Sequence, residues 1–463
     1  MNLLPSQQAL DFVVVTGSSL LAALTCRKIE NPVTRRLLLG GVGFITAIYY
    51  SGLQFLYVLP LILLTSSIAM TKYHPNVVLV IAFVLRILSN ILAIQFKSWD
   101  DDNTITGSLL MITTLKAVGV SYEVHTYYFA KQETHSTNRK VLSNPLEHEP
   151  KYVDILLYLF CCCGQFTGPY YTFKTYYEGT SIPNKVYSKT HWKQYSCKIF
   201  LHCLIAITIH LIGRQYVGLH LLATEGFKTM SLPTRILQVV LTSQNGGLFL
   251  ISSWLGAECV CVVAGIGAYP KEMKSKSGQG PTAHFNTSED TSDWDFETIT
   301  NMRCWKHYAC CRASEALKEW NSCTQWWLVR HCYIADFIPQ KDKMLRLFFT
   351  MTISAMWHGL KPGFYILFWT SSFVTISERI CDNLRTGLSD VWKMSLDFFM
   401  FICFRWIVIP FAGLGLLLQE FEPIYEVYKS CYFLHIISIV MIPLVLTICS
   451  QFQPKPNIKS KIT

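Results

Sequence analysis

The feature that most limits what this chain can fold into is a series of apolar segments, each long enough to cross most or all of a lipid bilayer. A full crossing by an α-helix takes roughly 20 apolar residues, so the shorter segments must be tilted, re-entrant or extended by their flanks. The segments cover residues 12–25, 37–50, 53–70, 76–96, 109–130, 152–160, 199–212, 236–268 (one or two passes), 344–360, 364–376, 394–418 and 431–449.

The composition favours a membrane protein over a soluble one. Hydrophobic residues make up 51% of the 463 residues, charged residues only 15%, and the mean hydropathy is +0.30. A soluble domain usually carries about 25% charged residues, and a charge that faces lipid is costly. The sequence therefore predicts an all-α, polytopic membrane protein with about 9–12 membrane helices, folded as one domain over residues 1–463.

The charges of the chain indicate how its loops are placed. The 40 basic and 30 acidic residues give a net charge of +10 that is dispersed, which argues against nucleic-acid binding and suits loops near anionic lipid headgroups. Arg27, Lys28, Arg35 and Arg36 follow the first apolar segment, so this loop is predicted to be cytosolic. No basic region precedes that segment, and a cleavable signal peptide is not indicated.

Three polar stretches, 131–151, 176–198 and 269–320, separate apolar segments. The second carries several lysines and is predicted to be cytosolic. The third leads into the candidate catalytic helices, and the first half of it is flexible by composition. A glycosylation sequon at Asn286 falls in this stretch and would be inert in the cytosol.

The basic tail, 450–463, is predicted to be cytosolic. Lys459 and Lys461 stand at the fifth and third positions from its end, a pattern that resembles the retrieval signal of endoplasmic-reticulum membrane proteins. We therefore expect a multi-pass protein of the endoplasmic-reticulum membrane. A solvated basic tail without a targeting role is the alternative.

The 17 cysteines are clustered or lie in apolar segments, so free thiols are expected. Cys304, His307, Cys310 and Cys311 lie close together in the sequence, but their spacing is not that of a known zinc finger. No metal site is predicted.

Ionisable residues within membrane segments are costly and are functional candidates, although many of them pair with one another for structural reasons. Nine such residues are present: Arg86, Lys116, Glu123, His202, His210, Glu258, His358, Asp397 and Arg405.

His358 is distinguished by its position in the sequence. It lies between Trp357 and Gly359 in S-A-M-W-H-G-L-K-P-G, where Lys361-Pro362-Gly363 predicts the end of a helix. The histidine is therefore expected in the last helical turn, where a neutral imidazole can accept a proton near pH 7.

Asn321 lies in a second distinctive stretch, E-A-L-K-E-W-N-S-C-T-Q-W-W-L, residues 315–328. Leu317, Trp320, Asn321, Thr324 and Leu328 recur at helical spacing, so we expect one helix with Asn321 on its apolar face. An amide there needs hydrogen-bond partners, and a role in holding two membrane helices together is the structural alternative.

The spacing of Asn321 and His358 suggests that they belong together. Asn321 stands 18 residues before Pro339, and His358 stands 19 residues after it. If Pro339 marks a turn between two antiparallel helices, equal offsets place both side chains at a similar depth.

These two stretches resemble the membrane-bound O-acyltransferase family. W-N-S-C-T-Q-W-W-L followed by S-A-M-W-H-G-L-K-P-G-F-Y carries the resemblance with high specificity. Further similarity lies in G-Q-F-T-G-P-Y-Y-T-F-K-T-Y (164–176), W-L-G-A-E-C-V-C-V-V-A-G-I-G-A-Y-P (254–270) and D-W-D-F-E-T-I-T-N (293–301). The 254–270 stretch points to the branch that acts on inositol lipids.

The resemblance implies a central reaction chamber in which Asn321 and His358 are the catalytic pair. It implies acyl-CoA as donor and co-substrate without a further cofactor, and lysophosphatidylinositol as acceptor, in phospholipid remodelling by the Lands cycle. A polyunsaturated acyl group of the arachidonoyl type is favoured in that branch. Trp320, Trp357 and Glu258 are the candidate substrate-binding residues. Ser322, Cys323 and Met356 depart from the expected pattern and put the acyl preference in doubt.

The chemistry also follows from the residues. A thioester is already activated, so one base that takes the proton of the acceptor hydroxyl is sufficient, and His358 fits that role. Asn321 can orient a substrate or donate to the developing oxyanion. Direct transfer is favoured over a covalent route through a cysteine. Lys193 and Lys198 are candidates to meet CoA phosphates.

Two other functions compete with this interpretation. One is an O-acyltransferase that acts on another lysophospholipid, a sterol or a protein hydroxyl. The other is a membrane transporter, for which internal repeats and paired charges in several segments are typical, and neither is clear in this sequence.

Overall fold

The computed structural model describes residues 7–71, 73–95, 104–130, 145–283, 293–335, 337–339, 341–385 and 388–451. Asn286, Lys459 and Lys461 lie outside these ranges, as do most of the polar stretch 131–151 and of the tail 450–463.

The described chain is built almost entirely from helices, with one short antiparallel strand pair. The first half contains α1 (Gln7–Cys26), α2 (Pro32–Ser51), η1 (Gly52–Gln54), α3 (Phe55–Met70), α4 (Pro75–Gln95), α5 (Thr104–Ala130), α6 (Tyr152–Leu159), α7 (Phe173–Ser181), α8 (Asn184–Tyr187), η2 (Ser188–Thr190), α9 (Trp192–Val217), η3 (Leu219–Ala223), α10 (Glu225–Thr229) and α11 (Leu232–Ala264).

The polar stretch that follows contains β1 (Tyr269–Pro270), η4 (Lys271–Met273), β2 (Trp294–Asp295), η5 (Glu297–Ile299), α12 (Cys304–Ala309) and α13 (Ala313–Lys318). The C-terminal part contains α14 (Ser322–Leu328), the π-helix η6 (Val329–Tyr333), α15 (Lys343–His358), α16 (Pro362–Arg385), α17 (Asp390–Met400), the π-helix η7 (Phe401–Val408), α18 (Ile409–Leu418), α19 (Phe421–Ser430) and α20 (Leu434–Gln451).

Five helical runs among the described residues are long and apolar enough to cross a bilayer: 32–70, 75–95, 192–223, 232–264 and 390–418. Residues 13–26 form a shorter apolar helix. The run 236–268, for which one or two passes were expected, lies mostly in the single helix α11. The all-α, polytopic class is confirmed.

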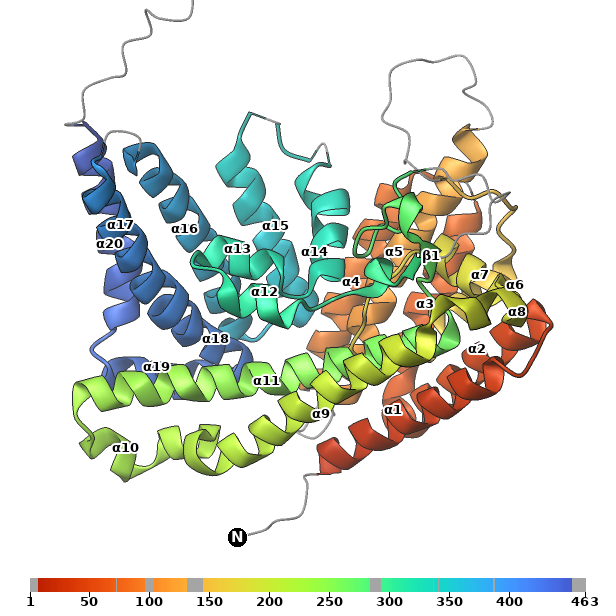
Figure 1. Cartoon of the computed structure of the whole chain (residues 1–463), viewed down its shortest axis with the longest axis horizontal. Helices are drawn as coiled ribbons and strands as arrows, with labels where there is room; N and C mark the ends of the chain where they lie inside the picture. Colours follow the sequence, from red (N-terminus) through yellow and green to blue (C-terminus); the bar gives the residue numbers. More distant parts are fainter. Residues whose placement is uncertain are drawn as a thin grey trace, which may run out of the picture.

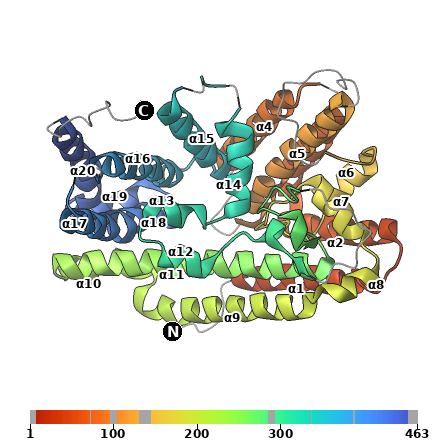
Figure 2. The same cartoon turned by 45° about the horizontal axis from the view of Figure 1, so that its top comes forward.

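The long helix α11 joins the two halves of the molecule. It runs beside α9 along one side and contacts α1 at one end and α18 at the other, while α2–α5 and α16–α20 stand at opposite ends (Figures 1 and 2). The short helices α12–α14 lie between these two groups. The arrangement places the candidate catalytic stretches in the middle of the protein.

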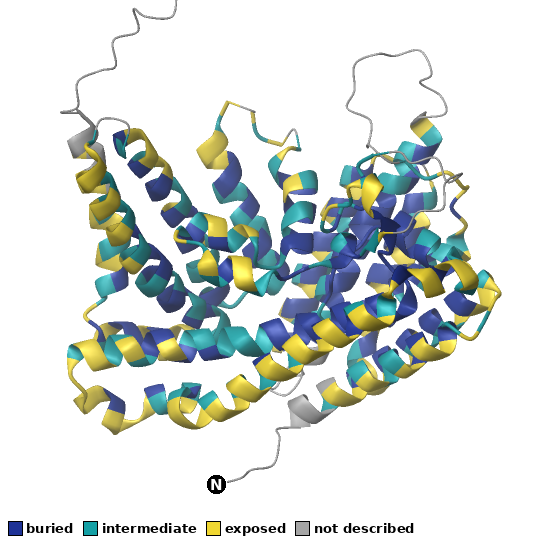
Figure 3. Cartoon of the chain, viewed as in Figure 1, coloured by how far each residue is buried: buried dark blue, intermediate teal, exposed yellow. Residues whose placement is uncertain are grey.

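The outer surface of the helices is apolar, as contact with lipid requires. Exposed residues run along much of α9 in Figure 3, and this helix is only 17% buried over its apolar window. Its exposed large side chains are Phe200, Leu201, Leu204, Ile205, Ile209, Leu211, Ile212 and Tyr216. An aqueous solvent would not favour such a surface on a monomer.

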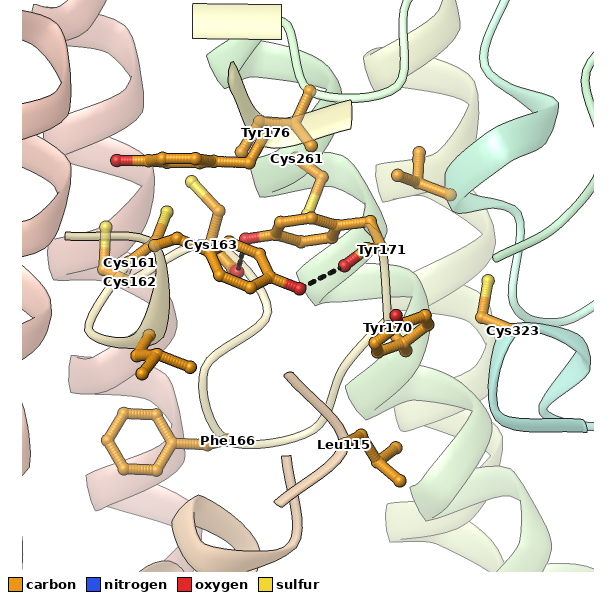
Figure 4. Packing of buried hydrophobic residues seen from close by; sticks show 14 of the residues in the cluster. Leu115, Cys161, Cys162, Cys163, Phe166, Tyr170, Tyr171, Tyr176, Cys261 and Cys323 are labelled. Carbon is orange, nitrogen blue, oxygen red and sulfur yellow. Dashed lines mark hydrogen bonds between the residues drawn. The ribbon is translucent and has the colours of Figure 1, made fainter. Parts of the chain in front are cut away.

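The main core contains buried tyrosines and cysteines beside the loop that follows α6 (Figure 4). The Tyr158 hydroxyl donates to the Tyr171 carbonyl, and the Tyr171 hydroxyl donates to the Cys163 carbonyl, both at 2.6 Å. All the cysteines whose side chains are described are free thiols. This agrees with the expectation from their apolar surroundings.

The first half of the polar stretch is folded among its described residues. Tyr269 and Pro270 pair with Asp295 and Trp294, and Lys276 forms a bridge with Gly280. The flexibility expected from its composition is therefore wrong for these residues, because one bridge within the stretch and a pairing with residues more than twenty positions later hold the backbone. The folded stretch packs against η5 and the start of α14. The Gly278 amide donates to the Thr298 carbonyl at 2.8 Å, and a Cβ on Gly278 would lie 2.8 Å from the carbonyl oxygen of Cys323.

Candidate active site

Three glutamates, of which Glu258 and Glu378 are buried and Glu123 partly buried, bind the backbone of short helices and loops rather than each other. Each carboxylate accepts hydrogen bonds from two consecutive backbone N–H groups, which satisfies amides that have no partner in their own helix. The pairs are Glu123 with Phe173 and Lys174 (2.8 and 2.9 Å), Glu258 with Asn301 and Met302 (2.9 and 3.2 Å), and Glu378 with Ala313 and Ser314 (2.8 and 3.0 Å).

Buried arginines do the same at carbonyl groups near helix C-termini. A guanidinium there satisfies backbone acceptors and opposes the negative end of the helix dipole. The pairs are Arg86 with the carbonyls of Trp357 and His358 (3.2 and 3.0 Å), Arg35 with those of Thr180 and Ile182 (3.2 and 2.5 Å), and Arg405 with that of His307 (3.2 Å).

The other ionisable candidates divide into bonded and exposed residues. The Lys116 ammonium donates to the Tyr158 carbonyl at 3.3 Å, and His210 Nδ1 lies 2.9 Å from the Asn245 carbonyl. Asp397 forms an ion pair with Arg385 at 2.7 Å. His202 is exposed on α9. For these residues the structural interpretation is sufficient.

His358 differs from them because its ring is partly buried and its nitrogens make no hydrogen bond with the described residues. The ring packs between Trp357, Phe364 and Phe368, with centroid distances of 4.7, 5.4 and 5.1 Å. Arg86 fixes the backbone of this residue and leaves the imidazole available. A neutral ring held by aromatic neighbours is suited to accept a proton.

The glycine after His358 ends α15. Gly359 has φ +149°, and a Cβ on it would lie 3.2 Å from Phe364 and 3.5 Å from the Asn90 amide oxygen. A larger residue would therefore be strained there and would push against the aromatic wall. The prediction that His358 lies in the last turn of its helix is confirmed.

The predicted continuous helix over 315–328 is wrong. The chain forms α13 and α14 with a break between them, and Asn321 adopts a left-handed conformation (φ +50°, ψ +47°) as the residue that precedes α14. Asn tolerates this conformation better than most residues. Gln325 stabilises the break, because its side-chain amide donates to the carbonyls of Leu317 and Trp320.

The break removes Asn321 from the predicted apolar face. Its side chain is partly buried and makes no hydrogen bond within the described residues. The side-chain amide therefore stays available. Because the backbone of Asn321 is left-handed, this side chain leaves the chain in another direction than it would from a helix.

A chain of hydrogen bonds connects α11 to the residues around Asn321. Glu258 accepts the Asn301 amide, the Asn301 carbonyl accepts the Ser322 amide at 2.8 Å, and the Asn301 side-chain oxygen accepts the Cys323 amide at 3.2 Å. These three hydrogen bonds link α11, the loop at Asn301 and the start of α14, and so fix the position of Asn321. Asn301 was not among the residues predicted from the sequence, where its only signal was its place in D-W-D-F-E-T-I-T-N.

The candidate substrate-binding residues each have defined contacts in the structure. Trp320 packs edge-on against Trp254 of α11 at 5.0 Å and beside His307 at 5.3 Å. Trp357 is buried and its indole donates to the Met111 carbonyl at 2.8 Å. Glu258 and Trp357 therefore use their polar groups on the backbone, which suits residues that position the pair, whereas Trp320 presents an aromatic surface.

His307 is also held by backbone. Its Nδ1 lies 2.8 Å from the Ala316 carbonyl, and burial together with the positive charge of Arg405 lowers the pKa of His307 to about 4. It is therefore neutral at physiological pH and can donate that hydrogen bond.

The two helical arms on either side of Pro339 are present but unequal. From Asn321, α14 and η6 cover 322–333, and α15 covers 343–358, which correspond to lengths of about 18 and 24 Å at the rise of an α-helix. Asn321 and His358 stand at the ends of their arms remote from Pro339. Their common depth stays a prediction.

His358 and Asn321 offer one base and one neutral hydrogen-bond donor that make no hydrogen bond with the described residues. Comparisons with known proteins give this chemistry a context. The model of the membrane-bound O-acyltransferase family (MBOAT) matches residues 48–418.

Individual relatives are similar over most of their length. The chain is 30% identical over 375 residues to a membrane-bound acylglycerophosphatidylinositol O-acyltransferase of Xenopus laevis, covering 77% of each chain. To the proteins of the same description in Danio rerio and Homo sapiens it is 28% and 26% identical, over 87% and 91% of this chain and 86% and 90% of theirs.

Proposed function

The chain belongs to the membrane-bound O-acyltransferase family, and we propose that it transfers a fatty acyl group from acyl-CoA to lysophosphatidylinositol, which gives phosphatidylinositol and free CoA. It is a multi-pass membrane acyltransferase that acts on a lysophospholipid. The proposal of an inositol headgroup on the acceptor is supported by the similarity to acylglycerophosphatidylinositol O-acyltransferases over most of both chains. The proposal includes a polyunsaturated, arachidonoyl-type acyl group and the endoplasmic-reticulum membrane.

His358 acts as the general base in the proposed mechanism. The imidazole takes the proton of the acceptor hydroxyl as the oxygen attacks the thioester carbon, and the carbon–sulfur bond then breaks. The same proton passes to the departing thiolate, so that CoA leaves as a thiol. The free ring nitrogens of His358 support this role, because no described side chain competes for them.

Asn321 stabilises the oxyanion that forms on the thioester oxygen. A neutral amide can donate to that oxygen without neutralising the nearby base. The left-handed backbone and the bonds from Asn301 and Gln325 hold it in place before substrate arrives. Trp320 offers an apolar wall for the acyl chain, and Glu258 and Trp357 act on substrate through the position of the pair.

The contacts of the intramembrane charges favour this function over transport. Glu123, Glu258, Arg86 and Arg405 bind backbone groups at fixed places in the fold. A conduction path needs such groups to face a passage and exchange ligands. Acyl transfer needs only that they hold a rigid chamber around one base.

Purified protein in lipid nanodiscs tests the reaction. With acyl-CoA and lysophosphatidylinositol, we expect phosphatidylinositol and free CoA thiol to appear in equal amounts, the first by mass spectrometry and the second by a thiol reagent. The protein without lysolipid serves as the control and should release little thiol. Thiol release without new phospholipid would mean thioester hydrolysis and would contradict the proposal.

A further inference from the structure

A cavity lies outside the contacts of the catalytic pair. It is bounded by α5, the loop before α7, the folded stretch 269–281 and the α14–η6 segment. Pro145, Leu146, Tyr269 and Gln279 belong to the ends of polar connections, so the cavity adjoins the aqueous side of these segments rather than their apolar middle. A water-soluble ligand can therefore reach it.

Arg330 supplies an unused positive charge at this cavity. Its guanidinium lines the cavity and makes no ion pair or hydrogen bond within the described residues. The other charged lining residues are engaged: Lys174 binds Glu147 at 3.3 Å and Glu178 at 3.5 Å, and Glu123 binds two backbone amides. The available charge in the cavity is therefore positive.

His331 supplies an unused polar group beside it. The residue is only 3% exposed, it lines the same cavity, and its Nδ1 is buried without a hydrogen-bond partner. The ring is fixed between Tyr122 and Trp327, with centroids at 4.4 and 5.0 Å. An unsatisfied buried nitrogen costs free energy, and a ligand that accepts a hydrogen bond would remove that cost.

Both residues lie on the π-helix η6. An extra residue in a helical turn re-aims side chains, and such segments are frequent at functional sites. Here the π-helix places Arg330 and His331 consecutively at one cavity wall. Trp326, one turn earlier, and Tyr170 also line the cavity. Their rings are nearly parallel, with the centroids 6.1 Å apart and an angle of 18° between the ring planes.

We propose that this cavity binds the phosphate groups of the acyl donor, with Arg330 as the charged phosphate ligand and His331 as a hydrogen-bond donor. The inference rests on the proposed function, because it assigns a place to one of its two substrates. Guanidinium binds phosphate through paired, directed hydrogen bonds, and the cation is more effective in a partly buried site.

The separation between Arg330 and Asn321 favours the phosphates of the acyl donor over the phosphate of the lipid acceptor as the ligand of this cavity. Arg330 lies nine residues beyond Asn321 along nearly continuous helix, about 13 Å at the rise of an α-helix. The reacting hydroxyl of a lysophospholipid lies only a glycerol carbon or two from its phosphate. In acyl-CoA the long pantetheine arm separates the thioester from the phosphates, so it can span that length. Lys193 and Lys198, the earlier candidates for CoA phosphates, are exposed on α9 and do not line the cavity.

Direct binding to the purified full-length protein in nanodiscs tests the inference without requiring turnover. The probes are CoA and an acyl-pantetheine, which keeps the thioester but lacks the nucleotide and phosphates. We expect Arg330→Gln to weaken CoA binding roughly 10- to 100-fold, as the loss of a charged hydrogen bond predicts, and to leave acyl-pantetheine binding unchanged. Arg330→Lys should restore part of the affinity. Arg379→Gln, which removes an exposed arginine of α16, is the charge-matched control and should have no effect.

The possible results separate the inference from the proposed function. Equal CoA affinity in wild type and Arg330→Gln would overturn the inference, as would equal weakening of CoA and acyl-pantetheine. An Arg330→Gln variant that binds CoA normally but shows a raised KM for lysophosphatidylinositol would assign the site to the lipid phosphate and overturn the donor assignment. Arg330-dependent CoA binding in a protein that forms no phosphatidylinositol would support the inference and contradict the proposed acceptor.

Discussion

Replacing His358 with alanine is expected to lower kcat for acyl transfer by about 10²–10⁴-fold, the usual contribution of a general base. KM for both substrates should change little, because the ring meets the reacting proton rather than the bulk of either substrate. Initial rates of phosphatidylinositol formation by purified protein, at saturating acyl-CoA and lysophosphatidylinositol, measure the effect.

The fold of this variant should persist. Arg86 binds the main-chain carbonyls of Trp357 and His358, and these bonds do not depend on the imidazole. The loss of ring packing against Phe364 and Phe368 removes contacts worth about 0.5–1.5 kcal/mol each, which a protein of this size tolerates. His202→Ala is the matched control, since this histidine is exposed on α9. Normal activity of a well-folded His358→Ala protein would contradict the assigned base.

Substitutions of Asn321 should distinguish the role of its side-chain amide from the role of its backbone conformation. Asn321→Gly removes the amide and tolerates the left-handed conformation, so we expect kcat to fall about 10²–10³-fold, as for other oxyanion donors, with little change in thermal stability. Asn321→Ala should lose as much activity and also destabilise the protein by about 1–2 kcal/mol, because an alanine is strained at φ +50°.

Asn321→Asp is a further test. Its side chain is nearly the same size and tolerates the same backbone conformation, but a carboxylate cannot donate to an oxyanion. Activity should therefore be lost although stability is kept, which thermal unfolding in nanodiscs can measure alongside the rates. A glycine variant with full activity would show that only the backbone conformation of residue 321 matters.

Much of the fold could be predicted from the sequence, because the signal is strong and local. Long apolar segments require helices in lipid. Five helical runs of spanning length and one shorter apolar helix are found among the described residues, fewer than the 9–12 membrane helices that the sequence predicted. The position of His358 at a helix end was also predictable, since Gly359 and Pro362 lie directly beside it in the sequence. These predictions depended on neighbours within a few residues.

The site around Asn321 was predicted less well, because side-chain hydrogen bonds rather than hydrophobic spacing determine its backbone conformation. Periodicity over 315–328 indicated one helix, but the bonds that break it come from Gln325 and from Asn301, and Asn301 is fixed in turn by Glu258. Hydrophobic spacing carries no information on such contacts. The sequence showed which residue types were unusual, and only the fold showed which conformation they required.

The intramembrane charges illustrate the same limit. Arg86 and Glu123 were candidates with equal standing to His358, since each is costly in lipid. Their partners are backbone groups more than forty residues away, on helix ends that the sequence alone could not bring near. Once these bonds are known, His358 stands out among the candidates as a partly buried residue whose ring makes no hydrogen bond with the described residues.

An internal competition tests the central claim, that the acceptor is an inositol lysophospholipid, most directly. Purified protein receives acyl-CoA and an equimolar mixture of lysophosphatidylinositol, lysophosphatidylcholine, lysophosphatidylethanolamine and lysophosphatidylserine of one chain length. The early product ratio equals the ratio of the kcat/KM values, whatever the enzyme concentration. We predict phosphatidylinositol as the dominant product, with the His358→Ala protein giving almost none of any product. Comparable amounts of phosphatidylcholine and phosphatidylinositol would contradict the claim.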